Sequence, residues 1–400
     1  MTPRRGRAAG RVVAAALIMV AGCGTSPAGA AGAARPARTP AALPLALSLV
    51  DPGGTSWAVV PMGGARAQEE SFWQVFVRPA AAAGWRLATP AGVASNGGLV
   101  LAAAGAGAAV VGFRPSQDLT FSPLAATSDA GARWAPGGLV SPGLGDVPGA
   151  LAASAGGRVI AVTGAGNAEL GTSAGTRWSA LTTVRRLAAT AAGRACGLTG
   201  ITAAAFAGPD TALLGGTCAR PGRAGIFALR DGTWAADAPA LPAGLARRDV
   251  RVLRLGSVPG AGGRAPASTV AVLAVGSGAG AGVLAAWLAG GRWRRSAVLR
   301  TGGQPVRSAS LWPGGGVGLV LAGPRGGPGR GVTLAGPGAP WAAQPALPAG
   351  TATLARGAGG AIEALTVARS IMRAWRLGTA GPGWSSFQQV RVSIPYGSSS

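Results

Sequence analysis

Tryptophan recurs at nearly regular intervals along most of this 400-residue chain, and each copy has the same local context. A glycine precedes each of these tryptophans by one to three residues, and a short run of strand-forming residues follows. The intervals run from 43 to 59 residues, which suits one four-stranded repeat unit. The seven copies are Trp85, Trp134, Trp178, Trp234, Trp293, Trp341 and Trp384.

The copy at Trp134 ends the segment Thr127-Ser128-Asp129-Ala130-Gly131-Ala132-Arg133-Trp134. This Ser/Thr-x-Asp-x-Gly-x-x-Trp pattern resembles the Asp-box of sialidase-like (BNR-repeat) β-propellers. The resemblance implies a turn that joins the third and fourth strands of a propeller blade. In such a turn Asp129 accepts backbone hydrogen bonds, Gly131 takes a positive φ and Trp134 anchors the next strand, with Thr127 as the first residue of the box.

The other copies retain less of this motif. Ser173 occupies the Asp position before Trp178, and the turn before Trp234 has shortened to Asp231-Gly232-Thr233. This loss fits a structural repeat in which the turn matters and any metal or sugar chemistry does not. We therefore expect no metal site and no cofactor at these motifs.

The pattern predicts an all-β fold, a seven-bladed β-propeller of four-stranded antiparallel blades over residues 44–396, followed by a tail at 397–400. Gly-rich turns recur near the start of three units, at Asp51-Pro52-Gly53-Gly54, Ala155-Gly156-Gly157 and Pro313-Gly314-Gly315, and indicate hairpins. No long amphipathic helical pattern interrupts the units, which argues against an α/β fold. Two alternatives stay open: a blade number between six and eight, and a closing role for 45–49 in the last blade.

The N-terminus has the pattern of a targeting signal over residues 1–22, with four early arginines and an apolar stretch too short to span a bilayer. The run Val20-Ala21-Gly22-Cys23 resembles the bacterial lipobox. That resemblance implies cleavage before Cys23 and lipidation of its thiol, with residues 23–43 as a flexible Pro/Ala/Gly tether. The expected location is extracytoplasmic, anchored to the cell membrane. The alternative is an ordinary signal peptide with a coincidental cysteine.

All basic residues are arginine, and the formal net charge is +24. Arginine without lysine is typical of a very G+C-rich genome, as in actinobacteria, so the bias does not require a functional explanation. The charge still attracts anionic surfaces and polymers. Cys196 and Cys218 are the two cysteines beyond Cys23, and in an oxidising compartment we expect them to form a disulfide.

Catalytic residue types are scarce. The chain has no histidine, which removes Ser-His-Asp catalysis and the usual zinc sites. Sialidases use a tyrosine nucleophile, and the single tyrosine here, Tyr396, lies four residues from the end. The adjacent pair Glu69-Glu70 fits a solvated loop. We therefore expect no catalytic residues.

The sequence favours a lipid-anchored, non-catalytic binding or scaffold module at the cell envelope, monomeric, with an envelope protein or an anionic polymer as partner. Nucleic acid is not expected, because Arg292-Trp293-Arg294-Arg295, the best basic and aromatic stretch, fits an exposed blade edge. The alternative is a sialidase-like glycan-processing enzyme that uses carboxylates in the propeller channel. The acids considered for it are Glu169, Asp210, Asp249 and Glu363.

Overall fold

The computed structural model describes residues 45–62, 72–91, 93, 95–96, 98–113, 124–136, 148–164, 166–172, 178–260, 268–324, 327–378 and 383–393. These residues belong to one compact unit, Thr39–Ser400. The predicted signal peptide, Cys23 with its tether, Glu69-Glu70, Ser173, Tyr396 and the tail at 397–400 lie outside the described residues.

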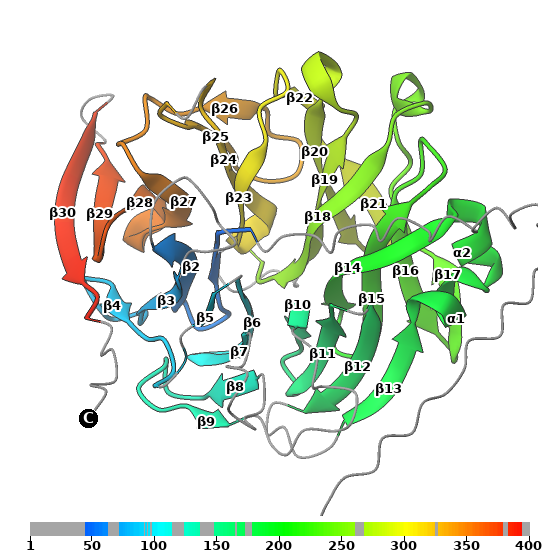
Figure 1. Cartoon of the computed structure of the whole chain (residues 1–400), viewed down its shortest axis with the longest axis horizontal. Helices are drawn as coiled ribbons and strands as arrows, with labels where there is room; N and C mark the ends of the chain where they lie inside the picture. The colour runs from blue at the N-terminus through cyan, green and yellow to red at the C-terminus, as the bar shows by residue number, and fades with distance from the viewer. Residues whose placement is uncertain are drawn as a thin grey trace, which may run out of the picture. The chain divides into compact units, whose positions relative to one another are not determined.

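The described strands form seven consecutive runs in which each strand pairs antiparallel with the next along the chain (Figure 1). Runs 1 to 3 are β1 (Leu47–Val50), β2 (Ser56–Met62), β3 (Phe72–Arg78), β4 (Arg86–Leu87); β6 (Leu99–Gly105), β7 (Ala108–Phe113), β8 (Leu124–Thr127), β9 (Ala135–Pro136); and β10 (Pro148–Ala153), β11 (Arg158–Thr163), β12 (Asn167–Thr172), β13 (Trp178–Thr183). The short β5 (Ser95–Asn96) adds to β3.

Runs 4 to 7 follow the same order. They are β14 (Leu198–Ala207), β15 (Thr211–Cys218), β16 (Gly225–Arg230), β17 (Thr233–Ala236); β18 (Val250–Val258), β19 (Ser268–Val275), β20 (Gly282–Ala289), β21 (Arg292–Arg295); β23 (Val306–Trp312), β24 (Gly316–Leu321), β25 (Arg330–Leu334), β26 (Trp341–Ala343); and β27 (Thr351–Arg356), β28 (Ile362–Ala368), β29 (Ile371–Leu377), β30 (Trp384–Arg391). The short β22 (Leu299–Arg300) adds to β20. The prediction of a nearly all-β chain is confirmed.

Hydrogen bonding does not keep all seven runs apart. Runs 2, 3 and 7 are separate four-stranded sheets, whereas runs 4 and 5, and runs 1 and 6, join into nine-stranded sheets. Run 1 meets run 6 through a parallel pairing of β1 with β23 at Leu49↔Leu311. Because β1 pairs antiparallel with β2 and run 7 has four strands of its own, residues 45–49 do not complete the last run.

The marker tryptophans all lie at the fourth strand of a run or directly before it. Several donate their indole N–H to the segment that follows the fourth strand of the preceding run. Trp134 Nε1 bonds to the Ala88 carbonyl at 2.8 Å, Trp293 to Asp237 at 2.8 Å, and Trp341 to the Ala297 carbonyl at 2.9 Å. These three tryptophans therefore also connect neighbouring runs, which gives a physical reason for their recurrence.

One apolar cluster of buried side chains lies between each run and the next. A further cluster joins run 7 to run 1 and includes Ala58 and Phe76 with Leu365 and Met372. Burial of such side chains is the main favourable contribution to folding. Each run therefore has two apolar faces, as the continuous apolar stretches in the sequence indicate.

Two short helices, α1 (Val184–Ala188) and α2 (Ala191–Cys196), lie between β13 and β14, where the sequence shows no helical pattern. Thr183 caps α1 and Thr190 caps α2, each accepting a backbone N–H of the first turn, and Gly197 ends α2 at a φ of 65°. With five and six residues, the helices are too short to show a periodic pattern. No helix among the described residues has the length and apolar character needed to cross a bilayer.

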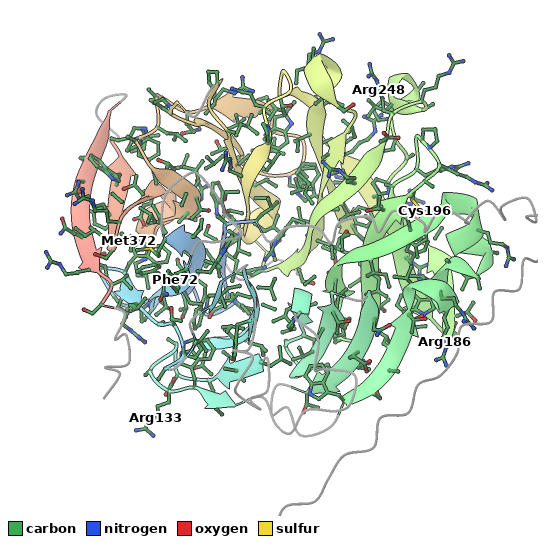
Figure 2. All side chains as sticks on the ribbon, in the orientation of Figure 1. Phe72, Arg133, Arg186, Cys196, Arg248 and Met372 are labelled. Atoms are coloured by element: carbon green, nitrogen blue, oxygen red, sulfur yellow. A yellow bond between two sulfur atoms is a disulfide. The ribbon has the colours of Figure 1, made fainter. Side chains whose placement is uncertain are left out.

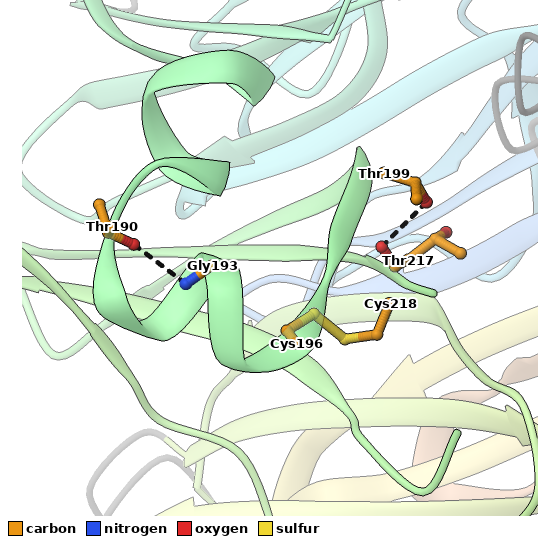
Figure 3. The surroundings of a disulfide bond; sticks show 6 residues. All are labelled: Thr190, Gly193, Cys196, Thr199, Thr217 and Cys218. Atoms are coloured by element: carbon orange, nitrogen blue, oxygen red, sulfur yellow. Dashed lines mark hydrogen bonds between the residues drawn. A yellow bond between two sulfur atoms is a disulfide. The ribbon is translucent and has the colours of Figure 1, made fainter. Parts of the chain in front are cut away.

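The predicted disulfide between Cys196 and Cys218 is present (Figure 3). It joins the last residue of α2 to the last residue of β15, with the Cα atoms 5.0 Å apart. Beside it, Thr199 Oγ1 donates to the Thr217 carbonyl at 3.1 Å, and Thr190 Oγ1 accepts from Gly193 N at 3.0 Å (Figure 3). The bridge thus ties the helical insertion to the sheet of run 4.

Candidate functional site

A cavity of about 460 Å³ lies where the first strands of runs 1 to 6 converge. Its volume falls in the range of small-molecule sites. Three of these first strands have alanines here, in the segments Leu101-Ala102-Ala103, Leu151-Ala152-Ala153 and Ala204-Ala205-Phe206. The short alanine side chains leave space between the strands. The largest apolar side chains on its wall are Leu49, Leu101, Leu151, Phe206, Leu255 and Leu311.

Arg254 supplies the positive charge on this wall. The pairing of β18 with β19 shifts register between Val252 and Arg254, so Leu253 is the extra residue of a β-bulge. Val252 and Leu255 consequently pack into the same apolar cluster, although regular alternation would place them on opposite faces. Arg254 borders both the large cavity and a neighbouring one of about 40 Å³.

The guanidinium of Arg254 has no carboxylate partner among the described residues, and its buried Nε makes no hydrogen bond to them. Desolvation lowers the pKa of Arg254 to about 10, which keeps the side chain cationic at neutral pH. Arg254 is half-buried, and a charge withdrawn from water without a partner is costly. An anion in the cavity would supply that partner.

Asp51 is the acid among the described residues that line the cavity, and its oxygens are already used. Oδ1 accepts from Thr55 N at 2.9 Å, and Oδ2 accepts from Gly107 N at 2.7 Å and from Trp57 Nε1 at 3.4 Å. Asp51 therefore holds the first turn of run 1 against run 2. This explains why the Asp-Pro-Gly-Gly turn predicted from the sequence begins with a carboxylate.

The hydroxyl groups of two other lining residues are also engaged. Ser257 Oγ donates to the Phe206 carbonyl, and Thr269 Oγ1 donates to the same oxygen at 3.3 Å. These bonds fix the strands that surround the cavity. Among the charged side chains of the described wall, Arg254 is therefore the one whose N–H groups have no hydrogen-bond acceptor among the described residues.

The four acids considered for catalysis do not line this cavity. Glu169 is buried in β12, where desolvation raises the pKa of its carboxyl. Asp210 is exposed and forms a salt bridge with Arg158, and Asp249 is exposed. Within the described ranges, no three acids or cysteines gather in a way that would hold a metal ion.

Glu363 is fully buried between run 7 and run 1, at the centre of a polar cluster. Arg78 Nη1 donates to both of its carboxylate oxygens, at 2.9 and 2.8 Å, and Trp85 Nε1 donates at 3.0 Å. Arg376 Nη2 donates at 3.0 Å from the solvent side. Arg78 also donates to the Arg356 carbonyl at 2.8 Å and lies over the ring of Trp85. This cluster connects runs and leaves no free carboxylate for chemistry.

The segment from Thr127 to Trp134 forms a turn between β8 and β9. Asp129 Oδ1 accepts from Arg133 N at 2.9 Å and from Thr127 Oγ1 at 2.8 Å, and Thr127 Oγ1 accepts from Gly131 N at 3.0 Å. Gly131 has a φ of 74°, and a Cβ there would lie 2.9 Å from Ala88. The Trp134 ring meets Trp57 edge to face at 6.3 Å. These contacts give the box a structural role.

Replacing Asp129 with alanine is expected to lower the melting temperature at pH 7, because Arg133 N and Thr127 Oγ1 lose their acceptor. These hydrogen bonds hold the pKa of Asp129 below its usual value. Stability from a lowered pKa is present above the unfolded-state pKa and lost as pH falls through the folded-state pKa. Melting curves should therefore show a gap between variant and wild type at pH 7 that narrows below about pH 4. An equal gap at pH 7 and pH 3 would contradict this role.

Several arginines outside the cavity point outward. Figure 2 shows Arg133, Arg186 and Arg248 directed away from the sheets, and all three are exposed. On β21, Arg292, Arg294 and Arg295 are exposed as well, while Trp293 is partly buried. The basic excess therefore covers the surface, and Arg254 differs from these residues by its place at the cavity. Sequence reasoning did not identify Arg254, although the break in alternation at Val252-Leu253 marks the bulge beside it.

No protein-family model matches the chain, and no curated protein matches it. Solved structures with a similar fold include a GH74 xyloglucanase from Xanthomonas campestris, with 14% identity and a TM-score of 0.52 over 88% of this chain and 55% of that one. A protein from Lactobacillus plantarum aligns with 12% identity and a TM-score of 0.50 over 84% and 96%. The six-bladed β-propeller lectin of Aleuria aurantia aligns with 12% identity and a TM-score of 0.40 over 88% and 96%. At such identities the likeness concerns the fold alone: a nearly all-β chain with β-propellers among its structural neighbours.

Proposed function

We propose that the protein is a lipid-anchored, extracytoplasmic β-propeller that binds a ligand or an envelope partner and does not catalyse a reaction. The observation that carries the proposal is the central cavity. It has apolar walls, one arginine without a partner and one carboxylate that is fully engaged by its own turn. Such a wall suits binding, because acid/base catalysis requires titratable groups that are free to exchange protons.

The seven runs, in this proposal, are the blades of a seven-bladed propeller. Support comes from the apolar clusters, since each run packs against the next and the cluster of Phe76 with Met372 joins the last run to the first. The hydrogen-bonded cluster around Glu363 lies at this same junction. In a propeller closed in this way, side-chain contacts hold the last blade to the first, whereas other propellers add a strand to the last blade.

The lipid anchor remains part of the proposal. Cys23 would carry the lipid, and residues 24–43 would hold the propeller away from the membrane surface. The disulfide supports an oxidising compartment, because such bridges are rare in reducing ones. The lipid and the arginine-rich surface would together favour the outer face of an anionic membrane.

The test is capture from envelope membranes with the purified full-length protein, run in parallel with assays of product release from envelope glycans. We expect one or more envelope components to be retained above a tag-only control. We also expect less than one sugar molecule to be released per molecule of protein. A disulfide-intact protein that retains nothing would contradict binding to an envelope partner. Repeated turnover of a glycan would replace it with the enzymatic alternative.

A further inference from the structure

We propose that the central cavity binds one organic monocarboxylate with an apolar body, such as a medium-chain fatty acid, and that Arg254 holds its carboxylate. This inference rests on the proposed binding function and names the class of ligand. The carboxylate would lie at the bulge of β18, and the apolar body would extend along the leucine and phenylalanine wall.

The charges on the wall favour one negative charge on the ligand. Arg254 has no carboxylate partner among the described residues, and Asp51 directs its oxygens to Thr55, Gly107 and Trp57. A carboxylate carries one charge and matches the two-pronged donor geometry of a guanidinium. A phosphate monoester carries a charge of about −1.5 to −2, which one arginine does not balance.

The rest of the wall favours an apolar body. Leu49, Leu101 and Leu151 come from three different runs, and Phe206 and Leu255 come from two more. The hydroxyls of Ser257 and Thr269 donate to the Phe206 carbonyl, so neither presents its proton to a ligand. This leaves Ser154 and Ser268 as the hydroxyl donors of the described wall. A sugar would leave most of its hydroxyl groups without partners against this wall, whereas an alkyl chain would not.

The first experiment is calorimetric titration of the full-length protein with decanoate, decanol and acetate, all below the concentrations at which they aggregate. We expect decanoate to bind with a stoichiometry of one. Decanol lacks the charge and acetate lacks the apolar body, so each should bind at least about tenfold more weakly. Equal affinity for decanol and decanoate, or no decanoate binding, would overturn the proposal without any variant being needed.

The second experiment compares Arg254→Gln with Arg251→Gln, an exposed arginine three residues earlier on the same strand. Loss of the charged hydrogen bonds should weaken decanoate binding by about ten- to a hundredfold in Arg254→Gln and leave it unchanged in Arg251→Gln. Circular dichroism checks that both variants fold. An unchanged affinity in Arg254→Gln would remove Arg254 from the site.

The two proposals fail in different ways. If membranes yield a retained partner but decanoate does not bind, the cavity ligand is wrong and the binding function stands. If neither is observed, the binding function fails as well. If decanoate binds but nothing is captured, the protein is a carrier of small molecules and the envelope partner is wrong.

Discussion

Replacement of Glu363 with glutamine is expected to lower the free energy of unfolding by about 3–5 kcal/mol, because it removes one partner of a buried ion pair. Arg78 is 5% exposed and Glu363 is 0% exposed, so water cannot take the place of the lost carboxylate. The change leaves the Arg78 charge with only neutral acceptors, namely Ser56 Oγ, the Arg356 carbonyl and the amide oxygen of the new side chain. Trp85 Nε1 loses the charge of its acceptor as well.

Urea denaturation followed by tryptophan fluorescence measures this loss. The matched control is Asp210→Asn, which breaks the exposed salt bridge to Arg158, where the aspartate side chain is 71% exposed, and should change stability by about 1 kcal/mol or less. Adding Arg78→Met to Glu363→Gln should recover part of the lost stability, because the double variant no longer contains the unpaired Arg78 cation. A Glu363→Gln variant as stable as Asp210→Asn would show that this cluster does not hold run 1 to run 7.

The sequence allowed the repeat to be located because its signals are local. Each marker tryptophan lies within a fourth strand or directly before it, and the Asp51 and Ser154 turns close first hairpins through hydrogen bonds over four residues. Trp134 and Trp293 show the physical reason, since each must reach one acceptor in the preceding run. A local constraint of this kind recurs at a fixed place in each repeat and is visible without coordinates.

Contacts between distant segments had no such signal. Arg78 and Glu363 are separated by 285 positions, and nothing near either residue indicates its partner. The parallel pairing of Leu49 with Leu311 is equally remote in sequence and merges two runs into one sheet. The helices α1 and α2 were missed for the opposite reason, because a single turn of helix is defined by its caps, Thr183, Thr190 and Gly197, and not by a pattern.

The candidate site depends both on local sequence patterns and on contacts between distant segments. Arginine is so common in this chain that its position alone identifies nothing, and 36 residues share the type. Arg254 becomes distinct because a bulge changes the alternation of β18 and because six different runs contribute to the cavity beside it. Apolar alternation predicts which strands are buried, but it does not predict where several first strands leave a space between them.

Replacement of Cys196 and Cys218 with serine is expected to cost about 3 kcal/mol, the value that the chain-entropy model gives for a closed loop whose ends are 22 positions apart. The loop contains α2 only at its edge, but the bridge fixes the C-terminal end of that helix to β15. The pairing of Leu198 with Cys218 begins the β14–β15 ladder at the same point. Without the bridge, the helical insertion should open before the sheet of run 4 unfolds.

Thermal denaturation with and without a reductant separates this effect from the cost of the serine side chains. Reductant should lower the melting temperature of the wild type to near that of the double variant and should leave the double variant unchanged. Limited proteolysis locates the opening. Cleavage should be faster in the double variant after the exposed arginines of α1 and α2, which are Arg185, Arg186 and Arg194. Cleavage after Arg292 on β21 should not change. Equal cleavage at both places would mean that the bridge stabilises all seven runs evenly, because the loss would then reflect global unfolding and not the local release of α2.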